Sequence, residues 1–204
     1  LAGIAAQVRQ VGYWIIAAQF GIALALAIPG QGIMGLGGPD FVGGTGALAF
    51  LLAAEVVAAT AVVSEAALVY VARVQNLLIS LLTFTLQGLL TLGGIMLVTE
   101  MGLNDNFRAA AAAAALMLSL GASSVLKSWL LAAKLNASVN NWRWTLAWAA
   151  APAVLTGWLA LTVLPEWAAL IFGMPAILFA YAYVIWHKGF GPEDRVLFRR
   201  NVGG

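Results

Sequence analysis

Long apolar stretches, separated by short polar or glycine-rich breaks, dominate the pattern of this chain. A helix that crosses the hydrocarbon core of a bilayer needs about 20 mostly apolar residues. The pattern therefore predicts an all-α polytopic membrane protein with a lead-in at 1–10, a tail at 187–204 and six transmembrane helices between them, at about 11–28, 46–70, 77–99, 108–134, 144–164 and 166–186.

The breaks between these segments have local causes in the sequence. Most contain glycine, proline or polar residues, which interrupt regular structure, and they fall at 29–39, 73–76, 103–107 and 136–141. The shortest break is at Pro165. A proline followed by Glu166 is typical of a helix start, because proline fits the first turn and an acid is stabilised near the positive helix end.

Composition agrees with this pattern and narrows the chemistry. Hydrophobic residues make up 63% of the chain, charged residues 9%, and the mean hydropathy is +0.95, which is more apolar than one soluble core accommodates. Cysteine is absent and His187 is the single histidine, so we expect neither a metal nor another cofactor. The sequence has no paired-aspartate, serine-elbow or zinc-helix motif, and we do not expect an enzyme.

The basic residues segregate to one face of the predicted membrane domain. That face holds nine of the ten Lys and Arg residues if each is assigned to its nearer side, and the other face holds only Arg108. Because basic residues favour the cytoplasmic side of a membrane, both termini are predicted to be cytoplasmic. These residues are dispersed at the ends of the spans, a pattern that indicates how the protein is oriented in the membrane. Because they do not form a cluster, we expect no nucleic-acid partner. The nine are Arg9, Arg73, Lys127, Lys134, Arg143, Lys188, Arg195, Arg199 and Arg200.

Four polar residues inside the predicted spans are costly in hydrocarbon: Glu55, Glu65, Gln87 and Lys127. An ionisable residue within a membrane indicates function by default or pairs with a partner. Glu55 lies nearest the bilayer centre, and for it we favour a role in transport, such as ion coupling. Glu65 and Lys127 lie at similar depth, so they either form an ion pair or contribute to a transport path, while Lys127 has the further alternative of extending to the interface.

Gln87 belongs to a polar stripe on the third span. Ser80, Thr83, Gln87 and Thr91 follow one another at spacings of three, four and four residues, which places them on one helix face. Individually, such residues bond their own backbone or a neighbouring helix. As a set they are better suited to a wetted groove, and we include them with the three charged residues as candidates for a substrate or ion pathway.

The tail, 187–204, is predicted to form a short amphipathic helix on the membrane surface. Pro192 suits its first turn, acids precede arginines along it, and the apolar residues at 196–198 supply the membrane-facing side.

Three stretches carry a resemblance to a known family. They are the glycine-rich loop Gly38, Pro39, Asp40, Phe41, Val42 and Gly44; the helix end Glu65 to Arg73, which turns into Asn76, Leu77 and Leu78; and the closing segment Gly189 to Leu197. Together they resemble the C-terminal part of the polysaccharide flippases of the multidrug/oligosaccharidyl-lipid/polysaccharide exporter superfamily. The resemblance extends over nearly all 204 residues, through diffuse motifs.

The resemblance implies a multi-pass transporter of the bacterial inner (cytoplasmic) membrane. Such proteins pass lipid-linked oligosaccharide through a cavity between two lobes for polysaccharide or lipopolysaccharide biosynthesis. The chain starts at Leu1, and these helices would then be the last six of a longer protein. The family's cavities usually contain several cations, whereas only Lys127 lies inside the spans here, where it would approach the substrate phosphate.

A second hypothesis from another class is a non-transporting integral membrane subunit, packed within a larger complex. Under either hypothesis the expected partners are membrane lipid and other membrane proteins, with a lipid-linked saccharide as substrate under the first.

Overall fold

The computed structural model describes residues 2–191 and 194, and every element within them is helical. Six helices are long and apolar enough to cross a membrane, which confirms the predicted all-α polytopic membrane protein. They are α1 (Ala2–Ala27), α3 (Thr45–Val71), α4 (Arg73–Glu100), α5 (Asp105–Leu135), α6 (Thr145–Val163) and the run Glu166–Lys188, which comprises α7 (Glu166–Ala168), η2 (Ala169–Gly173) and α8 (Met174–Lys188).

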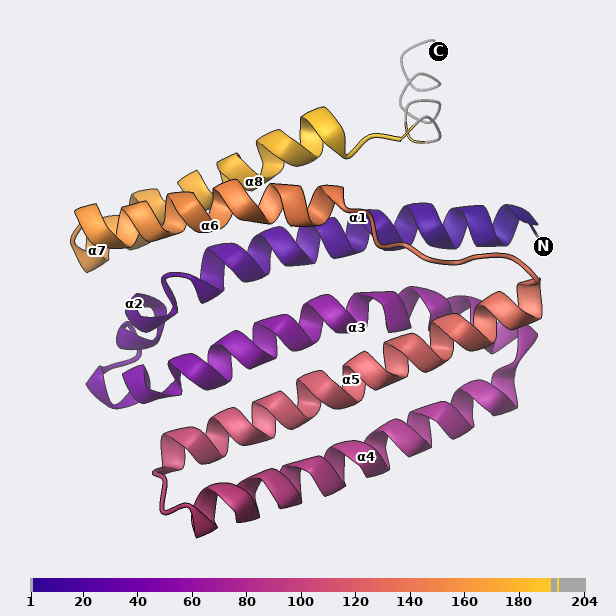
Figure 1. Ribbon diagram of the computed structural model, residues 1–204, viewed down its shortest axis with the longest axis horizontal. Coiled ribbons are helices and arrows are strands. Elements are labelled where there is room, and N and C mark those ends of the chain that lie inside the picture. The colour runs from indigo at the N-terminus through magenta and orange to yellow at the C-terminus, as the bar shows by residue number, and fades with distance from the viewer. Residues whose placement is uncertain (1, 192–193, 195–204) are drawn as a thin grey trace.

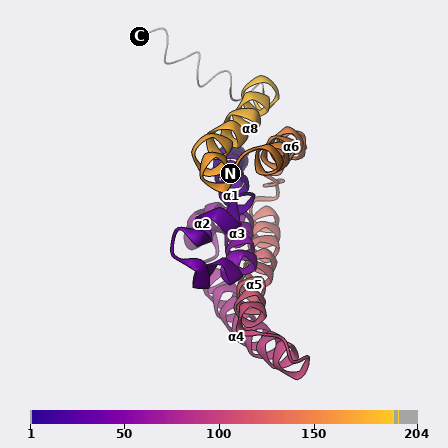
Figure 2. The ribbon, with the colours of Figure 1, turned by 90° about the vertical axis from the view of Figure 1, so that its left-hand side faces the viewer.

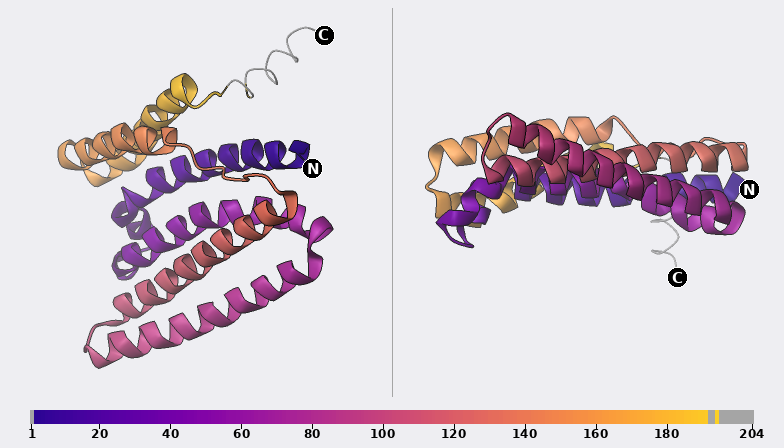
Figure 3. Two further views of the ribbon diagram at one scale, coloured as in Figure 1. Left: turned by 45° about the vertical axis from the view of Figure 1, so that its right-hand side comes forward. Right: turned by 90° about the horizontal axis from the view of Figure 1, so that it is seen from below.

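Four of the helices lie side by side in a row, in the order α4, α5, α3, α1 (Figures 1 and 2). Although α3 and α4 are separated only by Ala72, each packs mainly against α5. Helices α6 and α8 pack against each other and against α1, at the far end of the row from α4 (Figure 3). The helices form an elongated array that leaves large apolar faces open.

Both described ends of the chain lie at the same end of the molecule (Figure 1). There α1 begins and α3, α5 and α8 end, with Arg9, Arg73, Lys134 and Lys188 close by. We call this the basic end.

The glycine-rich segment after α1 is more ordered than the predicted break at 29–39. It folds into α2 (Gly30–Gly35) and a 3₁₀ helix, η1 (Pro39–Gly44). Gly38 separates them at φ 120°, a conformation that glycine adopts without the strain of a side chain. The glycine and proline residues therefore predicted the break between the spans, but they did not predict the two short helices within it.

A π turn, η2, interrupts the last span. Pro175 is the second residue of α8, and because proline has no N–H and its ring crowds the carbonyl four residues earlier, it disfavours a regular α-helix through this point. The π turn widens the helix at that point and lets the span continue to Lys188.

Small residues set the close packing of α6 on its neighbours. Gly157, on α6, is buried, and a Cβ there would lie 2.6 Å from Ile28 Cγ2 and 3.0 Å from Ile177 Cδ1. Nearby, a Cβ on Gly173 would lie 3.2 Å from the Cβ of Ala160. Such small residues let membrane helices approach closely, which gains van der Waals contact where no hydrophobic effect favours association.

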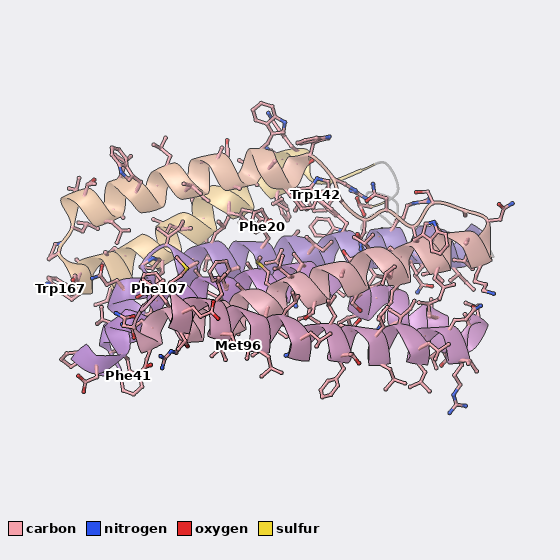
Figure 4. All side chains as sticks on the ribbon, turned by 60° about the horizontal axis from the view of Figure 1, so that its bottom comes forward. Phe20, Phe41, Met96, Phe107, Trp142 and Trp167 are labelled. Carbon is pink, nitrogen blue, oxygen red and sulfur yellow. The ribbon has the colours of Figure 1, made fainter. Side chains whose placement is uncertain are left out.

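The outer face of α4 contacts no other element of the described chain closely enough to bury it. The most apolar 18-residue stretch of this helix contains no buried residue, and Phe84 is 77% exposed. An apolar surface of this kind is suited to lipid. Aromatic residues also mark the ends of the helices, with Phe41 and Trp167 at the end opposite the basic end and Trp142 near the start of α6 (Figure 4).

We predict that Gly157→Ala destabilises the protein. The new methyl group must displace Ile28 or Ile177, and overpacking of this kind costs about 1–3 kcal/mol, more than the roughly 1 kcal/mol that alanine gains over glycine in a helix. Thermal unfolding in detergent would show a lowered midpoint. The matched control is Gly93→Ala on α4, where nothing lies within 4 Å of a new Cβ; an equal midpoint for the two variants would contradict the packing argument.

Candidate functional site

Lys127 and Glu65 form the ion pair that their similar depth predicts. Lys127 Nζ, on α5, donates to Glu65 Oε2, on α3, at 2.6 Å. The lysine side chain is only 5% exposed, so it does not extend to the interface, whereas the glutamate is 45% exposed. An unpaired buried ammonium is strongly destabilising, so the pair stabilises the contact of α3 with α5.

Hydroxyl groups continue this contact along the two helices. Ser64 and Ser128 lie 3.3 Å apart through their Oγ atoms, and Ser124 Oγ donates to the Val57 carbonyl. Ser64 is 1% exposed and Ser124 6%, so these groups bond where water is excluded. Small polar side chains therefore join α3 to α5 without holding the two backbones apart.

A cavity of about 660 Å³ lies between α3, α5 and the connection at 136–144. All the residues that line it are uncharged. Val56 and Val125 line it near the middle of the spans. The hydroxyl groups of Thr60, Ser124 and Ser128 lie on the helices, and Ser138 and the two amides lie on the connection. The lining residues are Ile16, Val56, Val57, Thr60, Gly121, Ser124, Val125, Ser128, Trp129, Ala132, Ser138, Val139, Asn140, Asn141 and Trp142.

Asn141 is the most constrained polar residue of the cavity wall. Its Oδ1 accepts a hydrogen bond of 3.1 Å from Thr60 Oγ1, and the residue is 4% exposed. Its Nδ2 is buried and has no hydrogen-bond partner within the described residues. The side chain packs over Gly12 of α1, where any Cβ would overlap it. The unsatisfied Nδ2 therefore lies against α1, although Asn141 as a residue also lines the cavity.

The polar stripe of α4 faces α5. Ser80, Thr83, Gln87 and Thr91 are each half-buried, on the side by which α4 packs. Thr83 Oγ1 donates to the Ile79 carbonyl at 2.8 Å, so this hydroxyl bonds its own helix. The predicted common face is present, but none of the described cavities includes these residues, and the wetted groove stays a hypothesis.

Glu55 lies apart from this polar contact. It is exposed on α3, and it has no hydrogen bond or ion pair with any other described residue. Neither it nor Glu65 lines the 660 Å³ cavity. Of the seven predicted pathway residues, the structure therefore joins only Glu65 to Lys127.

A second buried charge, which sequence reasoning missed, ties the C-terminal segment to α1. Asp194 is fully buried, although it was predicted only as an acid at the start of a surface helix. Its Oδ2 accepts from Arg143 Nη1 and from the Gly191 N–H, each at 2.8 Å. Its Oδ1 accepts from Gln10 Nε2 at 3.0 Å and from Trp14 Nε1 at 3.1 Å. The other residues of the predicted amphipathic tail from 192 onward lie outside the described part of the chain.

Arg143 completes this cluster from the other side. It also donates to the Gly189 carbonyl at 2.9 Å, and its guanidinium carbon lies 4.0 Å from the centre of the Tyr13 ring. Burial alone raises the pKa of the Asp194 carboxyl, but the hydrogen bonds from Arg143, Gly191, Trp14 and Gln10 outweigh it and hold the pKa below its ordinary value. The carboxylate therefore stays ionised and fixes the end of α8 against α1.

Comparisons of the chain with protein-family models, with curated proteins and with solved structures found no match.

We predict that the two members of the Lys127–Glu65 pair are not equivalent. Glu65→Met leaves a buried ammonium unpaired and should cost about 3 kcal/mol, the low end of the range for breaking a buried pair because the glutamate is half-exposed. Lys127→Met leaves the more accessible carboxylate and should cost less. The double variant should recover most of the stability in reversible unfolding; additive losses would show that the two residues act independently.

A further prediction concerns pH. Because the folded pKa of Asp194 is depressed, its contribution to stability is complete above the ordinary aspartate pKa of about 3.9 and is lost as the pH falls through the folded value. Asp194→Asn should therefore lower the unfolding midpoint by an equal amount from about pH 8 to pH 5, with the difference from wild type narrowing only in stronger acid. Asp105→Asn is the matched control, since Asp105 is 89% exposed in its pair with Arg108. Equal losses for both variants would contradict the assignment.

Proposed function

We propose that this protein forms part of a bacterial flippase that moves lipid-linked oligosaccharide across the cytoplasmic membrane. Two lines support the proposal: the resemblance of the sequence to the C-terminal part of polysaccharide flippases, and the character of the cavity between α3 and α5. The predicted orientation, with both termini cytoplasmic, would place the polar part of that cavity on the side where such a substrate is assembled.

The observation that carries the proposal is the change of chemistry along the cavity. On α3 and α5 its lining is mostly apolar with single hydroxyl groups, whereas on the connection the amides Asn140 and Asn141 join it. A lipid-linked saccharide has hydrocarbon, then a charged phosphate linkage and then a head rich in hydroxyl groups, so its hydrocarbon and sugar parts follow the same order. Sites for such ligands combine apolar surface with a few placed polar groups. Trp129 and Trp142 add flat apolar surfaces against which a sugar ring packs.

The charged residues take a different role in this proposal from the one that the sequence suggested. Lys127 pairs with Glu65 and does not line the cavity, so in this proposal the ion pair holds α3 against α5. Breaking this ion pair would allow alternating access, because it separates the two helices that flank the cavity. The cations that bind the phosphate of the substrate would then lie outside this cavity.

Filling the cavity tests the proposal directly. Gly121 lines it, and nothing lies within 4 Å of a Cβ built there, so Gly121→Phe should occupy the space without disturbing the helices. We expect loss of surface polysaccharide at unchanged protein level in cells that depend on the full-length protein. Gly93→Phe on α4 is the matched control, since its Cβ also meets nothing and lies outside the cavity. Normal export with Gly121→Phe would refute the assignment of this cavity to substrate.

The alternative is a non-transporting subunit, and the open helical array favours it. Four helices in a row leave apolar faces that other membrane proteins cover in a complex. Export that survives deletion of the protein, together with a partner purified in fixed stoichiometry, would select this alternative.

A further inference from the structure

Glu55 lies on an open face of α3. Leu51, Glu55, Val62, Ala66 and Tyr70 follow one another at spacings of four, seven, four and four, so they form one stripe along the helix. All five are exposed, with Leu51 at 44%, Val62 at 61% and Tyr70 at 91%. No described element of the chain covers this stripe, which we call the Glu55 face.

The position of Glu55 along α3 makes lipid an unfavourable neighbour. At 1.5 Å per residue it lies about 15 Å from Thr45 and about 24 Å from Val71, the two ends of the helix. It is therefore near the middle of a hydrocarbon layer about 30 Å thick. A glutamate is too short to reach the interface from there, and intramembrane acids pair with cations or line water.

The described chain has no cation free to pair with Glu55. Within residues 2–191 and 194, Lys127, Arg108 and Arg143 are each engaged by a carboxylate. The other basic residues of this part, Arg9, Arg73, Lys134 and Lys188, lie at the basic end. A second copy in the same orientation would bring the same described cations at the same depths, so none of these cations would reach Glu55.

We propose that the Glu55 face binds a transmembrane helix from outside these 204 residues that carries a lysine or arginine at the depth of Glu55. Charge complementarity supports this occupant, because a paired cation removes the cost of the exposed carboxylate. The shape of the face agrees with it: Ala66 leaves room for close approach, and a groove of about 350 Å³ between α1 and α3, lined by Ala66, Tyr70 and Val11 among others, continues the stripe to the basic end. The inference holds for a flippase and for a subunit alike.

Site-specific photocrosslinking in the native cells tests it. The benzophenone amino acid p-benzoylphenylalanine replaces Val62 on the Glu55 face, and in a matched control it replaces Phe84, which is 77% exposed on α4. We expect position 62 to yield an adduct with a transmembrane helix that contains Lys or Arg near the crosslinked residue, identified by mass spectrometry. Position 84 should yield lipid adducts.

Charge variants decide whether Glu55 makes the contact. Glu55→Gln should abolish the position 62 adduct at unchanged protein level, and Glu55→Lys combined with Glu in place of the partner's basic residue should restore it. An adduct with a second copy of this chain, an adduct with lipid alone, or a helix adduct that persists in Glu55→Gln would each overturn the proposal. Because none of these readouts measures export, their failure is distinct from failure of the flippase proposal.

Discussion

The cost of an unpaired polar group in hydrocarbon is the constraint on which this structure depends. Inside the spans the backbone is satisfied by helices, and each polar side chain that lacks a partner is costly. Lys127 is the clearest case, because a buried ammonium has to be neutralised and Glu65 is the carboxylate that α3 brings to it. That requirement fixes the register of α3 against α5, and the hydroxyl contacts of Ser64 and Ser124 agree with the same register.

The same constraint operates at the basic end, where it joins segments far apart in sequence. Asp194 takes donors from α1, from Arg143 and from the backbone beyond α8, so one carboxylate holds both ends of the described chain together. Arg143 also lies within the connection, 136–144, that forms a wall of the 660 Å³ cavity. Holding Arg143 against α1 therefore helps to position Asn141 and Trp142, and links the tail to the cavity through the packing of one arginine.

The sequence predicted the features that depend on hydropathy, helix periodicity and depth in the membrane. The spans follow from length and hydropathy, and the Glu65–Lys127 pair follows from matching distances to one membrane face. The order of helices in the row did not follow, because neighbours in sequence, α3 and α4, are both packed against α5 instead of each other. Asp194 was missed for a similar reason: its donors are scattered over Gln10, Trp14 and Arg143, and no local pattern joins them.

The ion pair between Lys127 and Glu65 changes which residues are candidates for a functional role. Inside the spans Lys127 and Glu65 pair with each other, whereas Glu55 has no ion pair with any described residue. The wall of the 660 Å³ cavity is instead uncharged, with hydroxyl, amide and tryptophan groups around Asn141, whose Nδ2 has no hydrogen-bond partner within the described residues. This wall and Glu55 lie on different faces of α3, with Thr60 on the cavity side. Since a rigid helix couples its two faces, a partner that engages Glu55 is placed to shift the wall of the cavity.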